Sequence, residues 1–168
     1  MTTRTLIIHR AGTSVDWADA AALVREHVEW MAAHAGFDPL RVQPALRNDL
    51  RDLAAAYRSG AALFLARHSD AAVGIVALRH HDDGSTELKR MFVQPRARGR
   101  GVADGLVAAV VDASSEHGSH SVWLETVRGA MDAAIAVYRR NGFVEVRDRR
   151  PELEIAGVLV MQRTLTAA

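Results

Sequence analysis

Five basic residues and two glycines crowd a short segment, residues 87–101, whose one acid is Glu87. Gly99 and Gly101 allow a ligand to approach the backbone closely, and they stand where a predicted strand passes into a predicted helix. The first N–H groups of a helix lack partners within it and its dipole is positive there, so a phosphate is stabilised. A surface turn with solubilising arginines is the alternative interpretation. The segment therefore predicts either a phosphate site or an exposed turn, and the context must decide.

Two common nucleotide motifs do not fit these glycines. The P-loop requires Gly-Lys followed by Ser or Thr, and no such triplet follows Gly99 or Gly101. The dinucleotide fingerprint requires a third glycine where Asp104 stands, one position before Gly105. The sequence therefore does not indicate a nucleotide triphosphatase or a Rossmann dinucleotide-binding protein.

The composition of the whole chain excludes several other chemistries. The 168 residues include 21 Lys and Arg against 20 Asp and Glu, a net charge of +1, which disfavours binding to nucleic acid or anionic membranes by bulk charge. The absence of cysteine excludes disulfides, thiolate zinc sites and a cysteine nucleophile, and it is typical of a reducing compartment. No apolar run has the length of a secretion signal or a bilayer span. We therefore expect a cytoplasmic protein with a single domain over residues 1–168.

The hydrophobic pattern predicts the elements that must position the glycine segment. The predicted elements are strand 5–9, helix 15–34, helix 46–57, strands 62–68, 72–80 and 86–93, helix 102–117, strand 121–127, helix 131–141, and strands 143–146 and 157–165. The three strands before the glycines form an antiparallel meander. The strand, helix, strand order around the glycines is a βαβ crossover, which predicts parallel pairing of residues 87–93 with residues 121–127. The fold class is thus α/β (α+β), with a mixed, mostly antiparallel central sheet.

Two stretches of the chain together resemble a known family. The first, Val93-x-Pro95-x-x-Arg98-Gly99-x-Gly101-Val102-Ala103, is similar to the acetyl-coenzyme A motif of the GNAT N-acetyltransferase superfamily. The second, residues 133–143, resembles the closing helix of that family and its Tyr-x-x-x-Gly-Phe ending. The order of predicted elements also matches the GNAT fold, which has helices on both faces of the sheet. The resemblance covers nearly the whole chain and implies an acetyl-CoA-dependent N-acetyltransferase.

The resemblance also implies which residues bind acetyl-CoA. Backbone N–H groups of residues 98–103 would cradle the pyrophosphate, and the backbones of Met91 and Val93 would pair with the pantetheine arm. The expected cofactor-binding residues are Met91, Phe92, Val93, Arg98, Gly99, Arg100, Gly101, Val102 and Ala103, and no metal is expected. Many members carry Asn where this chain has Met131, so a hydrogen bond from that side chain is absent here.

Glu87 is the expected catalytic base. An alkyl amine is mostly protonated at neutral pH, so a carboxylate or an ordered water must accept its proton before it attacks a thioester. Acids on this strand serve as bases in several relatives, and Glu87 shares a strand face with Lys89 and Met91. The alternatives are a surface glutamate paired with Lys89 or Arg90, and a base role for His81 or for water alone.

Tyr138 is the expected catalytic acid. It stands four residues before Gly142, where the family places the hydroxyl that protonates the departing thiolate. A tyrosine packed into the core would have the same neighbours on its helix. Because the chain has no cysteine, direct attack by the amine is favoured over an acyl-enzyme.

Other polar residues are interpreted structurally. A hairpin turn accounts for the run from His80 to Asp83, whose neighbouring side chains point to opposite faces of a strand and do not favour a metal site. His27 and His34, seven residues apart on the first long helix, are predicted to lie on an exposed face, and the alternative is that they approach an acceptor.

The expected partner is a small-molecule amine or an amino acid. A protein or peptide acceptor, and a coenzyme A-binding sensor without turnover, are the alternatives. No nucleic acid or membrane is expected as a partner, and a homodimer is compatible with the sequence.

Overall fold

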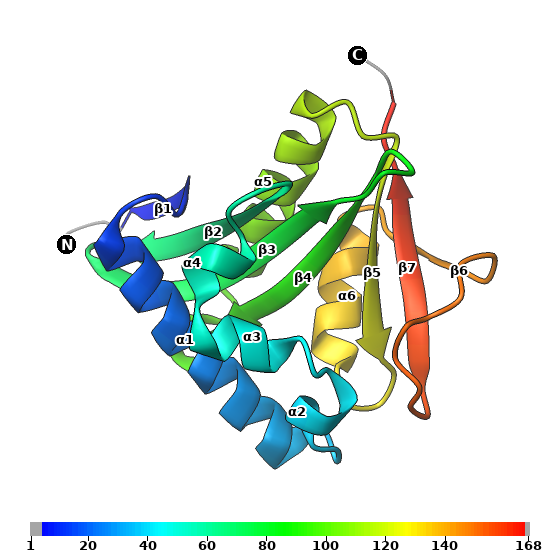
Figure 1. The fold of residues 1–168 in the computed structure, drawn as a ribbon, viewed down its shortest axis with the longest axis horizontal. Helices are drawn as coiled ribbons and strands as arrows, with labels where there is room; N and C mark the ends of the chain where they lie inside the picture. The colour runs from blue at the N-terminus through cyan, green and yellow to red at the C-terminus, as the bar shows by residue number, and fades with distance from the viewer. Residues whose placement is uncertain (1–4, 167–168) are drawn as a thin grey trace.

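A seven-stranded sheet runs through the computed structural model, which describes residues 5–166 (Figure 1). Its strands are β1 (Leu6–Arg10), β2 (Ala61–His68), β3 (Ala71–His80), β4 (Ser85–Val93), β5 (Ser121–Val127), β6 (Val144–Val146) and β7 (Val158–Thr164). They lie in the order β1-β2-β3-β4-β5-β7-β6. Neighbours pair antiparallel except β4 and β5, which pair parallel. The predicted mixed sheet with a parallel crossover is confirmed.

Helices cover both faces of this sheet (Figure 1). They are α1 (Ser14–His34), α2 (Pro39–Val42), α3 (Leu46–Arg51), α4 (Leu53–Ala56), α5 (Val102–Glu116) and α6 (Asp132–Arg140), with a 3-10 turn η1 (Pro95–Ala97). One core, which includes Leu23 and Ile75, joins α1 and α4 to one face, and a second core, which includes Leu106 and Ile135, joins α5 and α6 to the other. Among the described residues, no helix has the length and apolar character needed to cross a membrane.

The long helix α1 is fixed to the sheet at its first turn. The Thr13 hydroxyl accepts from the Asp16 backbone N–H at 3.1 Å, and the Asp16 carboxylate accepts from the Thr13 N–H at 3.1 Å, which is a capping box. Asp16 also contacts His9 of β1 at 2.9 Å and Arg67 of β2 at 3.2 Å. The hydrogen bond with His9 above all, and then those with Thr13 and Gly12, lower the pKa of Asp16 far below its usual range. The start of α1 is thus tied to two strands, and this fixes the direction of the helix across the sheet.

The single helix predicted over residues 46–57 is wrong, because the segment contains two short helices, α3 and α4, preceded by α2. The break falls at Asp52, whose φ of −154° and ψ of 87° are not helical. Its side chain accepts a hydrogen bond from the Ala55 N–H at 3.0 Å, which starts α4 as a new helix. Leu46, Leu53 and Tyr57 are nevertheless all buried, so the apolar spacing that suggested one helix does mark the packed face.

A bulge interrupts β4 at Arg90. The register between β3 and β4 shifts between Ile75 and Ala77, and Arg90 has a φ of 53°, in the left-handed region that side chains other than glycine disfavour. The buried Arg90 side chain donates from Nε to Asp49 at 2.6 Å and from Nη1 to Gln43 at 2.8 Å. These contacts hold the strained backbone in place.

The strands β4 and β5 pair over only a short stretch. Residues 85–87 pair with residues 121–123, and beyond Glu87 the two strands diverge, with α6 behind the gap (Figure 1). The predicted direction of pairing is correct, but the predicted parallel pairing of residues 88–93 is wrong. The backbone of β4 after Glu87 therefore has no partner strand on that side. This divergence, which periodicity does not reveal, positions the candidate site.

Close packing between β3 and α5 can be tested at Gly74. A Cβ added there would lie 3.1 Å from Leu106 Cδ1 and 3.2 Å from both Phe92 O and Val102 Cγ1. We expect Gly74→Ala to lower the free energy of unfolding by about 1–3 kcal/mol through overpacking. Each kcal/mol corresponds to about 2–4 °C in melting temperature for a chain of this size. Gly12→Ala is the matched control, since its Cβ would meet nothing within 4 Å. Equal melting temperatures of the two variants would contradict the close packing.

Candidate active site

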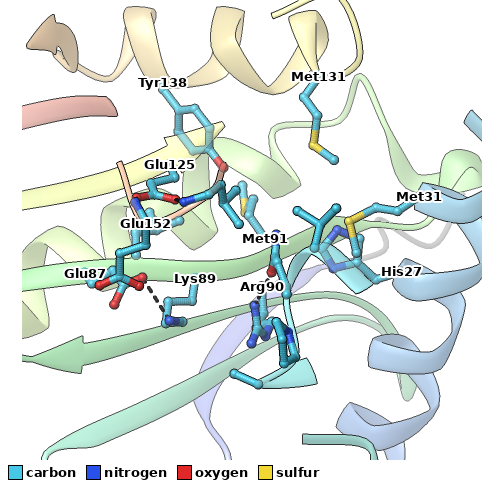
Figure 2. A pocket seen from close by; sticks show the side chains of 16 residues that line it. His27, Met31, Glu87, Lys89, Arg90, Met91, Glu125, Met131, Tyr138 and Glu152 are labelled. Carbon is cyan, nitrogen blue, oxygen red and sulfur yellow. Dashed lines mark hydrogen bonds and ion pairs between the residues drawn. The ribbon is translucent and has the colours of Figure 1, made fainter. Parts of the chain in front are cut away.

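Two cavities adjoin where β4 and β5 diverge. The larger, of about 730 Å³, lies between the glycine segment, the start of α5 and α6, and we call it the loop cavity. The smaller, of about 250 Å³, lies over β4 beside α1 and the α2–α3 segment, and we call it the strand cavity (Figure 2). His27, Met91 and Met131 line both. The thioether of Met131, where the family resemblance leads us to expect Asn, thus lies at the boundary between the cavities.

The loop cavity brings together eight of the nine predicted cofactor-binding residues. These are Met91, Phe92, Val93, Arg98, Gly99, Gly101, Val102 and Ala103. The Arg100 side chain lies instead in a separate pocket with Arg96 and His68. Only the backbone of Arg100 is therefore left to contribute to a cradle.

The glycine segment has the local geometry of a phosphate cradle. Gly99 and Gly101 have φ angles of 71° and 75°, which glycine adopts without steric cost. A Cβ added at either position would meet nothing within 4 Å, so open space lies in front of both. Gly101 is also the N-cap of α5, and the first N–H groups of that helix have no acceptor within it. The residues present therefore fit the pyrophosphate of coenzyme A.

Arginines brace this loop from two sides. Arg98 donates from Nε to the Val93 carbonyl at 3.0 Å, and its guanidinium lies 5.1 Å from the centre of the Trp30 ring. Arg140 of α6 forms an ion pair of 2.6 Å with Asp104 in the first turn of α5. The loop is therefore tied to β4, α1 and α6, and this limits its motion before a ligand binds.

Glu87 lies in the strand cavity and is only 8% exposed. One carboxylate oxygen contacts Lys89 Nζ at 2.9 Å, and the other contacts His81 Nε2 at 3.1 Å. Of the alternative, a surface glutamate paired with Lys89 or Arg90, the pair with Lys89 is observed. Glu87 is buried, however, and Arg90 pairs with Asp49. The two residues considered for the base, Glu87 and His81, form one hydrogen-bonded unit.

Tyr138 lies on α6 with its hydroxyl directed into the strand cavity (Figure 2). Its ring packs against Phe143 with the centroids 5.9 Å apart. Burial raises the pKa of Tyr138 well above its usual value, because a phenolate would be poorly solvated there. The phenol therefore stays protonated, as a proton donor must.

Glu125 of β5 also lines the strand cavity, and the sequence interpretation missed it. Its carboxylate accepts from the backbone N–H groups of Glu152 and Leu153, which holds the β6–β7 loop beside the cavity. Burial is the main cause that raises the pKa of this half-buried group, and the charge of Glu87 acts in the same direction. The available signal was a lone charge in the otherwise uncharged strand 121–127.

His27 is buried at 7% exposure, so its predicted place on an exposed helix face is wrong. Its ring stacks on Phe92 at 5.2 Å. Burial first, and then the charges of Arg90 and Arg98, lower the pKa of His27 to about 3. Its position four residues before the buried Met31 was the sequence signal for this burial. His34, by contrast, is exposed as predicted.

His80 and His81 lie next to each other in the chain but contact different residues. His80 contacts the Thr86 hydroxyl at 2.8 Å and stacks on His117 at 3.6 Å, while His81 turns to Glu87. Across residues 5–166 no group of three or more His, Cys, Asp or Glu is arranged to hold a metal ion.

Residues 28–143 match the acetyltransferase (GNAT) family. The chain belongs to this family. An IAA acetyltransferase of Azospirillum brasilense is 36% identical over 104 residues, which are 61% of this chain and 67% of that protein. An N-acetylaspartate synthetase of Rattus norvegicus is 35% identical over 102 residues, 59% of this chain, and the match spans only 34% of that longer protein.

The same fold is found in solved structures. That of PaiA N-acetyltransferase from Thermoplasma acidophilum in complex with coenzyme A superposes with a TM-score of 0.73 at 15% identity, covering 96% of this chain and 99% of that one. With the family match, the predictions of a GNAT fold and of an acyltransferase of the N-acetyltransferase type are confirmed.

The buried imidazole of His27 predicts a specific pH dependence of stability. Its pKa is about 3 in the folded chain against 6.5 ordinarily, so below pH 6.5 the unfolded chain binds a proton that the folded chain does not. The free energy of unfolding then falls by up to about 1.4 kcal/mol per pH unit. Between pH 7 and pH 5, we expect the free energy of unfolding to fall by about 2 kcal/mol less in His27→Leu than in the wild type, as measured by urea unfolding.

The matched control is His34→Leu on the same helix, whose imidazole is exposed. This variant should keep the wild-type dependence of stability on pH. If the free energy of unfolding of His27→Leu depended on pH as in the wild type, the buried ring would accept a proton in the folded chain.

Proposed function

We propose that this chain transfers an acetyl group from acetyl-CoA to the primary amine of a small molecule or an amino acid by direct attack of the amine. The observation that carries the proposal is the junction of the two cavities between β4 and β5. A cradle that fits coenzyme A lies on one side, and Glu87 and Tyr138 lie on the other. The names of the matched relatives, an IAA acetyltransferase and an N-acetylaspartate synthetase, agree with a small acceptor.

In this proposal, acetyl-CoA is a substrate that supplies the activated acetyl thioester. The backbone N–H groups of residues 98–103 bind its pyrophosphate. The backbone of Met91, Phe92 and Val93 lies beyond the last β4–β5 pair and has an unpaired edge, which suits an extended arm with amide groups of its own. Most of the proposed contacts with acetyl-CoA are therefore made by the backbone, so the side chains at these positions can vary without loss of the site.

Glu87 acts as the base. It accepts a proton from the ammonium form of the acceptor, directly or through a water, so that a neutral nitrogen forms the new bond to the acetyl carbon. His81 bonds to the other side of the same carboxylate and is partly exposed, which provides a route for the proton to solvent. Tyr138 donates its phenolic proton to the sulfur as the carbon–sulfur bond breaks. The nitrogen loses its second proton as the amide forms, and this proton restores the Tyr138 phenol, directly or through water. The products are an N-acetylated acceptor, free coenzyme A and the one proton that Glu87 releases to solvent.

The base assignment predicts that Glu87→Gln lowers turnover by roughly a hundredfold, since the amide accepts no proton. The loss should shrink at high pH, where more of the amine arrives neutral. Turnover is measured by release of coenzyme A thiol, and the dissociation constant of acetyl-CoA should not change. Glu145→Gln, at an exposed acid paired with Arg128, is the control and should retain full activity. Wild-type turnover of Glu87→Gln at pH 7 would transfer the role to His81 or to water.

The acid assignment predicts that Tyr138→Phe lowers turnover by roughly tenfold to a hundredfold, at the low end of acid catalysis because a thiolate is a fair leaving group. The melting temperature should change little, since the ring and its packing remain. Tyr57→Phe is the control for a structural effect. The Tyr57 hydroxyl donates to Asp49 at 3.0 Å, so its loss should lower the melting temperature. If Tyr138→Phe instead melts lower with unaltered turnover, its hydroxyl is structural.

The cradle is tested with a pair of glycines that share a backbone conformation. Acetyl-CoA at a hundred times its dissociation constant should stabilise the wild type by about 2.7 kcal/mol. Gly101→Val should lose this stabilisation, because the side chain fills the space in front of the loop. Gly118→Val is the control, since Gly118 has a φ of 83° and open space but ends α5 far from the cradle. Both variants lose stability through backbone strain. Equal stabilisation of both by acetyl-CoA would refute the cradle.

A further inference from the structure

Apart from Lys89, which pairs with Glu87, the charged side chains of the strand cavity are separated by sign along its length (Figure 2). Glu87, Glu125 and Glu152 lie toward one end, and the charge of Glu87 is near enough to affect the titration of Glu125. Arg90 and His27 lie toward the other end, where the charge of Arg90 acts on the His27 ring. The cavity therefore has an acidic end and a basic end.

The acidic end keeps a surplus of negative charge. Lys89 is held by Glu87 at 2.9 Å, so these two charges offset each other. Glu125 and Glu152 have no such partner among the ion pairs of residues 5–166, and Glu125 binds only backbone N–H groups. This end suits a cationic group, such as the ammonium form of an amine that Glu87 then deprotonates.

The basic end offers hydrogen-bond donors that the protein does not use. The Arg90 guanidinium has five N–H groups, and its hydrogen bonds to Asp49 and Gln43 use the Nε group and one group on Nη1. The strained backbone of Arg90, with a φ of 53°, keeps this buried side chain at the cavity wall. A strained, buried arginine with donors to spare is typical of a ligand site.

His27 adds a second, independent observation at the basic end. The side chain is more than nine-tenths buried, lines both cavities, and its Nδ1 has no hydrogen-bond partner in the described chain. No protein group fixes the proton of the neutral ring on Nδ1, so Nε2 can carry it and donate to a ligand. A bound anionic oxygen can accept from Nε2, and the nearby charges of Arg90 and Arg98 favour it.

We propose that the acceptor is a small zwitterionic amino acid, with its ammonium group at the acidic end and its carboxylate bound by His27 and Arg90. The proposal rests on the acetyl transfer proposed above and names the acceptor class. A simple amine would leave the donors of His27 and Arg90 unpaired, and the second ammonium group of a diamine would offer them no acceptor. A site built on buried hydrogen bonds discriminates strongly against analogues that cannot form them. The cavity volume of about 250 Å³ is enough for a small amino acid.

The test compares acceptors that differ only in the carboxylate. Release of coenzyme A thiol is measured with L-alanine, L-leucine, L-methionine and L-aspartate, with the α-carboxamide of each, and with putrescine. For at least one amino acid, we expect kcat/KM to exceed that of its amide by about tenfold to a hundredfold, the effect of a charge-assisted hydrogen bond. Turnover that favours the amides or putrescine overturns the carboxylate proposal and leaves acetyl transfer intact.

Two variants of His27 locate the effect. His27→Leu should raise KM for the preferred amino acid by about tenfold with little change in kcat, and should not affect its amide. His27→Asn keeps an N–H donor and should recover part of this loss. A residue with only a structural role would change KM for acid and amide alike, and that result would remove His27 from the site.

A binding measurement separates failure of this proposal from failure of the proposed function. N-acetyl-L-amino acids and their N-acetyl amides are titrated calorimetrically into the wild-type protein saturated with coenzyme A. Tighter binding of the acids by about tenfold, lost in His27→Leu, supports the carboxylate site even if no acceptor in the panel is turned over. Equal binding of acids and amides, or no binding of the acids, overturns it.

Discussion

The buried ion pair between Arg90 and Asp49 is the contact on which the site depends. Its 2.6 Å bond joins β4 to the α3 helix, and the Tyr57 hydroxyl donates to the same Asp49 oxygen. Removal of either charge would leave the other buried without compensation, which costs far more than an exposed pair would. The pair also fixes Arg90 in a left-handed conformation and so maintains the β4 bulge. The packing of α3, the bulge in β4 and the basic end of the strand cavity therefore all depend on this ion pair.

Two adjoining cavities lie where β4 diverges from β5, next to the bulge at Arg90. Glu87 is the last residue of β4 that pairs with β5, and Met91, four residues later, lines both cavities. One strand thus presents the proposed base before the bulge and an open backbone edge after it. α5 begins shortly after the end of the same strand, so its N-terminus lies at the far end of that edge. A cofactor bound along this path would reach from the helix N-terminus to the proposed base, so the βαβ crossover would carry most of the proposed chemistry.

Sequence reasoning succeeded where the determining contacts are local. The glycine loop, the parallel crossover and the position of Tyr138 follow from turn residues, periodicity and short motifs. The bulge at Arg90 could not be predicted, because its partner Asp49 lies 41 residues away. The break at Asp52 was hidden by apolar spacing that continues through it. His27 was misplaced because a histidine suggests solvent, although its position in the apolar stripe of α1 favoured burial.

Two of the cavity carboxylates, Glu87 and Glu125, have different partners, and these partners suit them to different roles. Glu125 accepts two backbone N–H groups of the β6–β7 loop, and its protonation would weaken the contact that keeps this loop at the cavity. Glu87 contacts only side chains, Lys89 and His81, which can shift as a proton arrives. A base must bind and release a proton in every cycle without moving the walls of its site. Glu87 meets this requirement, whereas Glu125 is suited to hold the loop and to provide negative charge toward an incoming ammonium group.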